Sequence, residues 1–257
     1  MAGKRLIVLA FLALVMTGCS NSASGPVSPG ATSTGQSQSG TLPPLASPDT
    51  PMFSVNGAET AGGRGACVFD PATGQFTCPD QSRDGITFTR RFTLYDAKGA
   101  VQSAFDPKTT ASIKTETTAN GTTSRGDATV TLNRRGTMTT TGLGSGATTH
   151  TLNGSEQGTV VVRSPSGSTN TSINDATTDL VVPVRSRDGG PAYPLSGVTV
   201  HATVTTTTRG SETRTVTTRR QETFNGTNIV QVEITVDGAT ARCTYDLAAH
   251  TSTCARR

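Results

Sequence analysis

The chain has 257 residues and a formal net charge of +4, and threonine accounts for 49 of the residues. Because threonine is β-branched and disfavours helices, this content excludes a helical bundle. The sequence also lacks the alternation of strand and helix patterns that a nucleotide-binding α/β enzyme requires.

The N-terminus has the pattern of a secretory signal peptide. Lys4 and Arg5 form a basic start, and residues 6–16 are an uninterrupted apolar run. This run is too short to span a bilayer, but its length is typical of the apolar core of a signal peptide. We therefore expect the chain to be exported.

The end of this segment, Met16-Thr17-Gly18-Cys19, resembles the lipobox of bacterial lipoproteins. The resemblance implies that residues 1–18 are removed and that Cys19 becomes the acylated N-terminus of a membrane-anchored protein. Ser20 follows in place of an aspartate, which in Gram-negative lipoproteins favours the outer membrane. The alternative is an ordinary secretory signal followed by an unmodified cysteine.

Cleavage would also change the charge balance. Loss of the two basic residues of the signal leaves 20 basic against 18 acidic residues, so the mature protein is close to neutral. Such a protein lacks the basic footprint of a nucleic-acid-binding domain. Nucleic acid is therefore not an expected partner.

The remainder divides into a tether and one domain. Residues 19–65 are rich in Ser, Thr, Pro and Gly and have few charges, which predicts a disordered, flexible tether after the lipidated cysteine. From residue 66 to residue 257 apolar and polar residues alternate, as in half-buried antiparallel strands. We expect a single all-β domain, an antiparallel meander of hairpins that forms a large twisted or curled sheet, either a half-barrel or a sandwich.

Two features of the alternation make specific predictions. In residues 198–205 the valines should face the core, while His201 should lie on the solvated, threonine-bearing face. Type I′ hairpin turns are predicted at four dipeptides: Asn120-Gly121, Asn153-Gly154, Asn225-Gly226 and Asp237-Gly238.

Four cysteines besides Cys19 form two pairs with the same spacing, Cys67 with Cys78 and Cys243 with Cys254. Ten intervening residues suit a hairpin with a four-residue loop, in which the two cysteines face each other and form a disulfide. Crossed pairing between the hairpins and free thiols remain alternatives. A metal site is disfavoured, because zinc-binding cysteine pairs are usually separated by only about two to four residues.

Candidate catalytic residues are few. His150, His201 and His250 are predicted on a strand end, a strand and a hairpin loop, and none belongs to a catalytic motif. Asp70 and Asp246 recur at matching positions of the two cysteine hairpins, where an aspartate most often accepts turn hydrogen bonds. We therefore predict no catalytic residues, no metal, no cofactor and no enzymatic activity.

Three pairs of arginines fall within the predicted strands: Arg90-Arg91, Arg134-Arg135 and Arg219-Arg220. Consecutive strand residues point to opposite faces, so each pair should divide between the two sides of the sheet. If they lie on neighbouring strands, they could form a cationic stripe for an anionic glycan or a lipid head group. Simple solvated charges are the alternative.

The function expected from these features is that of a lipoprotein of the bacterial cell envelope, on its periplasmic or surface face. It would carry a non-enzymatic β binding or carrier module for a lipophilic, peptide-like or glycan ligand. The rival expectation is a structural or adhesive surface protein that contacts polysaccharide or neighbouring copies. The sequence predicts no oligomeric state.

Overall fold

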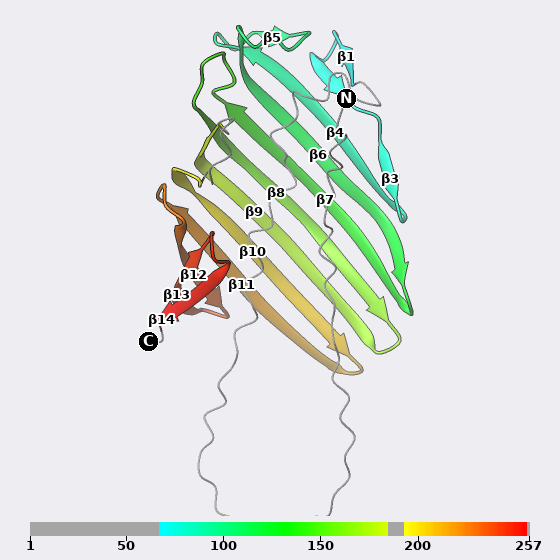
Figure 1. Ribbon diagram of the computed structural model, residues 1–257. Coiled ribbons are helices and arrows are strands. Elements are labelled where there is room, and N and C mark those ends of the chain that lie inside the picture. The colour runs from blue at the N-terminus through cyan, green and yellow to red at the C-terminus, as the bar shows by residue number, and fades with distance from the viewer. Residues whose placement is uncertain (1–66, 185–192, 256–257) are drawn as a thin grey trace, which may run out of the picture. The chain divides into compact units, whose positions relative to one another are not determined.

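The structure is a computed structural model that describes residues 67–184 and 193–255. The predicted signal peptide, Cys19 and the tether lie outside the described residues. All regular structure within them is β (Figure 1), and none of them belongs to a helix that could cross a membrane. The strands are β1 (Val68–Asp70), β2 (Gln75–Thr77), β3 (Gln81–Arg83), β4 (Ile86–Asp96), β5 (Val101–Gln102), β6 (Thr110–Arg125), β7 (Ala128–Thr141), β8 (Thr149–Ser164), β9 (Gly167–Pro183), β10 (Ser196–Arg209), β11 (Glu212–Phe224), β12 (Ile229–Val236), β13 (Ala239–Asp246) and β14 (Thr251–Ala255).

These strands form one antiparallel meander, which confirms the predicted fold class. The order across the sheet is β1-β2-β4-β6-β7-β8-β9-β10-β11-β12-β13-β14, and β3 and β5 pair with β4 (Figure 1). Strand β4 and strands β6 to β11 are long, with 11 to 17 residues each. The described part of the sheet does not close, because β1 pairs only with β2 and β14 pairs only with β13.

One face of the long strands carries the core, and we call it the inner face. Leu152 on β8 and Leu180 on β9 belong to a single buried cluster with Val230 and Val232 of β12 and Tyr245 of β13. The C-terminal strands therefore pack back against the inner face. The two valines are only 1% and 2% exposed, and burial of such a side chain contributes roughly 2 kcal/mol.

A second, smaller cluster lies near the other end of the sheet. It consists of Phe92 and Leu94 on β4 and Ile113 on β6, and Phe76 of β2 packs against it. The rings of Phe76 and Phe92 are stacked with their centroids 4.6 Å apart. The two clusters therefore cover only parts of the inner face.

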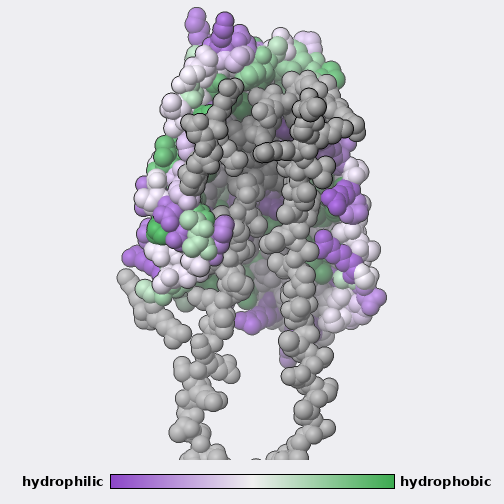
Figure 2. All heavy atoms as spheres, viewed as in Figure 1, coloured by the Kyte–Doolittle hydropathy of each residue, from purple (hydrophilic) through white to green (hydrophobic). Residues whose placement is uncertain are grey.

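The opposite face, the outer face, accounts for much of the threonine. Its residues form cross-strand hydroxyl pairs, including Thr122 with Thr131 at 3.1 Å and Thr206 with Thr215 at 3.1 Å. Each such pair stabilises a sheet by about 0.2–1 kcal/mol while leaving a face that water can wet. In the view of Figure 2, hydrophilic and intermediate residues make up most of the described surface that can be seen, and apolar residues form smaller groups.

The alternation in β10 was predicted correctly, and His201 is exposed on the threonine-bearing face as expected, but the prediction that the valines face the core was wrong. His201 pairs with Asp175 and Arg220 on the inner face, whereas Val200 pairs with Ala176 and Gln221 on the outer face. Period-two alternation does not say which face meets the core, because the register with the neighbouring strands decides it. In β12 the same alternation places Val230 and Val232 on the inner face, where they are the most buried residues of the larger cluster.

Only one of the four predicted type I′ turns is present. Asp237-Gly238 joins β12 to β13 with positive φ at both residues, whereas Asn225-Gly226 lies in a four-residue loop between β11 and β12 in which Asn225 does not have positive φ. Asn120-Gly121 lies inside β6 and Asn153-Gly154 lies inside β8.

Close packing explains why glycine occurs at these two strand positions. A Cβ atom on Gly121 would lie 2.0 Å from the carbonyl oxygen of Gly85, and one on Gly154 would lie 2.4 Å from that of Thr137. These glycines thus permit close approach of neighbouring strands rather than a change of chain direction.

Asn153 has a separate role at a bulge in the pairing of β8 with β9. Its side-chain oxygen accepts a hydrogen bond from the backbone N–H of Asp179 at 2.7 Å, and its amide donates to the Asp179 carboxylate at 3.1 Å. Asp179 has a φ of 46°, which an aspartate tolerates better than most residues. The asparagine therefore holds the bulge in place.

Both ends of the sheet are disulfide-linked hairpins. Cys67 is bonded to Cys78 and Cys243 to Cys254, so the pairing is within each hairpin. Residues 71–74 and 247–250 are the connecting loops, with the four-residue length that the spacing indicates. Short edges of this kind limit the unpaired backbone that a wide sheet exposes.

Candidate functional site: a polar row on the inner face

The long strands bring one line of residues into register across the inner face. Each residue of the line is the direct pairing partner of the next, from β4 to β11. This polar row consists of Arg90, Thr117, Gly136, Glu156, Asp175, His201 and Arg220. Charged groups are rare in the middle of a half-covered sheet, so the row is the candidate functional site.

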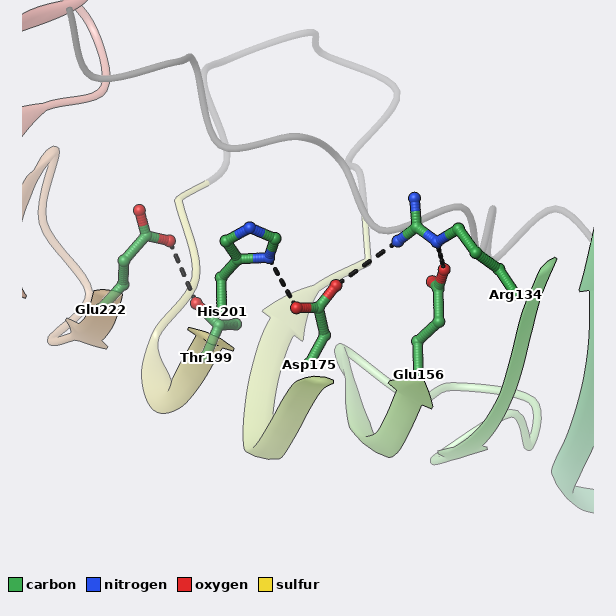
Figure 3. A network of polar contacts seen from close by, with 6 residues as sticks. All are labelled: Arg134, Glu156, Asp175, Thr199, His201 and Glu222. Carbon is green, nitrogen blue, oxygen red and sulfur yellow. Dashed lines mark hydrogen bonds and ion pairs between the residues drawn. The ribbon is translucent and has the colours of Figure 1, made fainter. Parts of the chain in front are cut away.

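Acids at the centre of the row are held by basic side chains. Arg134 lies two residues before Gly136 on β7 and on the same face. It forms an ion pair with Glu156 and reaches the carboxylate of Asp175 with its Nη2 at 3.5 Å. The other oxygen of Asp175 is 2.6 Å from Nδ1 of His201. Figure 3 shows these four side chains projecting from neighbouring strands toward the same side of the sheet.

The contacts of the row continue toward the C-terminal strands through a third acid, Glu222. Glu222 on β11 forms an ion pair with Arg220 and accepts a hydrogen bond from the hydroxyl of Thr199 at 3.0 Å. Glu222 pairs with Val232, so this contact borders the larger apolar cluster directly.

Burial sets the electrostatics of the row. Glu156 is 5% exposed and the side chain of His201 is 52% exposed, so the row runs from covered to solvent-accessible positions. Burial raises the pKa of the Glu156 carboxyl, the charge of Arg134 opposes this effect, and the nearby charge of Asp175 adds to it. The net effect is a raised pKa for Glu156, and Arg134 limits the rise.

Fold stability does not explain the row well. The cost of removing two charges from water often equals or exceeds their mutual attraction, so apolar residues in the same place would serve a fold at least as well. The sheet nevertheless has three acids here, Glu156, Asp175 and Glu222, each with a basic partner. Packing alone therefore does not account for the row.

An apolar strip lies beside the row, on the side of the turns that join β6 to β7 and β8 to β9. Its residues are half-buried, point to the inner face and belong to neither core cluster. They are Val130 and Leu132 on β7, Val160 and Val162 on β8, and Ile173 on β9. The inner face therefore offers charge and apolar surface next to each other.

The predicted histidine and aspartate candidates do not come together. His150 contacts the carbonyl oxygen of Gly142 at 2.9 Å, and only His201 lies in the row. Asp70 and Asp246 belong to hairpins at the two opposite edges of the sheet.

Each of these two aspartates serves its own loop. Asp70 accepts from the backbone N–H of Ala72, and Asp246 accepts from Ala248 and Ala249. These backbone bonds lower the pKa of both carboxyls, helped by the Thr73 hydroxyl at Asp70 and the Asn228 amide at Asp246. The described residues contain no group of three or more His, Cys, Asp or Glu side chains able to hold a metal ion.

The arginine pairs divide between the faces as predicted. Arg90, Arg134 and Arg220 lie on the inner face, while their sequence neighbours Arg91 and Arg219 lie on the outer one. They do not form the continuous cationic stripe that was considered, because β4, β7 and β11 are not adjacent and two of the three arginines are paired with acids.

Sequence reasoning missed the acids of the row, although a signal for them exists. Glu156 and Asp175 lie at equal distances from the turn at Pro165-Ser166, and His201 and Arg220 lie at equal distances from the turn at residues 210–211. Residues equally far from a tight hairpin turn become direct partners. Charged residues in such positions predict cross-strand pairs.

No family model matches the chain, and neither a curated protein nor a solved structure matches it. Its function has therefore to be inferred from the geometry of the inner face.

Proposed function

We propose that the chain is an exported, membrane-anchored lipoprotein whose β domain binds an amphipathic ligand on its inner face. The anchor rests on the lipobox-like segment that ends at Cys19. Two disulfides are in keeping with an oxidising compartment outside the cytoplasm. Catalysis is not part of the proposal.

The observation that carries the binding proposal is the polar row lying directly beside the apolar strip. A ligand with a polar end and an apolar body would satisfy both at once: its polar end would meet the half-exposed members of the row, and its body would cover the strip. Coverage of apolar surface supplies affinity, while a few placed polar groups fix orientation.

Ligand binding can be tested with matched variants of β8. Val160 belongs to the strip, and Val161, the next residue, faces outward. The full chain is titrated with a fluorescent fatty-acyl probe, and Val160→Asn is compared with Val161→Asn. We expect Val160→Asn to weaken binding at least tenfold, because it places a polar group against the acyl chain, and Val161→Asn to leave it unchanged. Equal behaviour of the two variants, or no binding by the unmodified chain, would refute the proposal.

Anchoring is tested separately. Cys19→Ser should move the protein from the membrane fraction to the soluble fraction and remove the mass of the acyl chains from the mature protein. If the variant stays in the membrane with an unchanged mass, Cys19 is not the lipidated residue, and the binding proposal is unaffected.

The outer face supports a second candidate, a structural or adhesive surface protein. Its cross-strand hydroxyl pairs, such as Thr122 with Thr131 and Thr235 with Thr240, form a wettable polar surface suited to polysaccharide. This candidate predicts cleavage by protease added to intact cells and retention on cell-wall polysaccharide. A carrier on the periplasmic side would be protected from the protease and would not be retained.

A further inference from the structure

Arg90 differs from Arg134, which lies next to the polar row, and from Arg220, which lies in it. Arg134 and Arg220 each have a carboxylate partner, whereas Arg90 forms no ion pair with any residue in the described part of the chain. Its Nε is buried and has no hydrogen-bond partner there. A buried donor without a partner is costly, so this position calls for an acceptor.

Thr117 presents a second polar atom in the same condition. The hydroxyl oxygen of Thr117 is buried and lacks a hydrogen-bond partner among the described residues. Thr117 on β6 is the direct pairing partner of Arg90 on β4. Side chains at directly opposed positions lie about 5 Å apart at Cβ, so a single acceptor group can reach both.

The surroundings of Arg90 favour an anion over a neutral acceptor. The guanidinium lies 5.8 Å from the centroid of the Phe92 ring, and burial lowers the pKa of Arg90. A half-buried cation with aromatic rather than acidic neighbours gains most from a negative ligand group. Carboxylate and phosphate oxygens match the donors of a guanidinium.

Apolar surface begins next to this pair. Phe88 lies on the same face two residues before Arg90 and is 36% exposed, which is unusual for an inner-face phenylalanine. Leu132 of the strip lies on β7, two strands away from β4. It pairs with Gly121 of β6, which in turn pairs with Ile86, two residues before Phe88. An apolar chain attached to the anion would therefore cover Phe88 and continue onto the strip.

We infer that Arg90 and Thr117 form the subsite for the anionic head of the ligand, a carboxylate or phosphate, and that the ligand is an anionic amphiphile. This inference rests on the proposed function, for which it names the ligand class. Arg90 supplies the charge and Thr117 donates a hydroxyl hydrogen bond.

The test compares dodecanoate, dodecanol and acetate as probes in calorimetric titrations of the full chain. The variants are Arg90→Gln, Arg90→Lys and Thr117→Val, and the matched control is Arg91→Gln, which removes the same charge from the outer face of the same strand. Circular dichroism and urea unfolding establish that each variant is folded.

We expect dodecanoate to bind more tightly than dodecanol. Arg90→Gln should weaken dodecanoate about tenfold to a hundredfold, as for loss of a charge-assisted hydrogen bond. Thr117→Val should weaken it about threefold to tenfold, Arg90→Lys should retain part of the affinity, and Arg91→Gln should change nothing. Dodecanol binding should be indifferent to all four.

The outcomes separate this inference from the proposed function. Equal binding of dodecanoate and dodecanol, unaffected by Arg90→Gln, would overturn the subsite and leave the proposed function standing. Binding of acetate alone, dependent on Arg90, would support an anion subsite and overturn the amphiphile. If none of the three probes binds, both are wrong.

Discussion

Removing the two disulfides one at a time should destabilise the protein by unequal amounts. The bonds close loops of the same length, since the cysteines of each pair are 11 residues apart. Loop-closure entropy for this length stabilises the folded state by about 3 kcal/mol per bond. Chain entropy alone therefore predicts equal losses for Cys67→Ala/Cys78→Ala and Cys243→Ala/Cys254→Ala.

Packing makes the two losses of stability unequal. Cys243 is 3% exposed and belongs to the larger core cluster, whereas Cys67 and Cys78 are only partly buried beside the smaller one. Loss of a buried sulfur is comparable to loss of a methylene group and costs about 1 kcal/mol. We expect losses of about 3 kcal/mol for the N-terminal pair and about 4 kcal/mol for the C-terminal pair.

Urea unfolding followed by circular dichroism measures both losses against the unmodified chain. The slope of the free energy of unfolding against urea must stay the same, so that the comparison refers to one transition. Equal losses would show that the buried sulfur contributes nothing. Losses below about 1 kcal/mol for both would show that loop closure in the unfolded chain is not the source of the stabilisation.

Three further substitutions test other parts of the structure. Because burial raises the pKa of Glu156, the folded protein retains this proton to higher pH than the unfolded chain does. The stability of the wild type relative to Glu156→Gln should therefore fall as pH rises above 4.5. Urea unfolding from about pH 4 to about pH 7 measures this trend, and a constant difference between the two proteins would contradict it. Gly154→Ala should cost about 1–3 kcal/mol, because its Cβ would lie 2.4 Å from the Thr137 carbonyl oxygen, while Gly144→Ala, which meets nothing within 4 Å, should be near neutral; equal melting temperatures would contradict this account. The lowered pKa of Asp246 stabilises the fold above about pH 3.8, and this stabilisation is lost as pH falls through the folded pKa. Asp246→Asn should therefore make the protein less sensitive to acid. An unchanged acid-unfolding midpoint in this variant would count against the loop hydrogen bonds.

Much of the fold could be predicted because it depends on local sequence. The spacing of Cys243 and Cys254 fixes a hairpin and its loop length, and the alternation in residues 229–236 identifies a strand whose valines are buried. Each signal lies within a stretch that pairs with its neighbour along the chain. In a meander this is sufficient to predict the architecture.

The candidate site could not be predicted in the same way, because it depends on register across many strands. Glu156, Asp175 and His201 become neighbours only when two separate hairpins are aligned, and the bulge at Asp179 shifts that alignment by a residue. Composition also misled the turn prediction. The dipeptide Asn153-Gly154 is typical of turns, but in the structure Asn153 hydrogen-bonds to Asp179 at the bulge, and Gly154 allows the neighbouring strand to approach closely.

The order of the strands has a consequence for how the molecule assembles. Consecutive long strands, from β4 to β6 and on to β11, pair with one another in chain order, without a crossover. A chain that emerges N-terminus first, from a ribosome or a membrane channel, can therefore add its strands one after another, since each finds its partner already in place. Strands β12 and β13, which emerge among the last, are those that cover Leu152 and Leu180. The growing sheet thus keeps an uncovered apolar surface until synthesis or transfer is nearly complete, and that interval is when chaperones would be needed most.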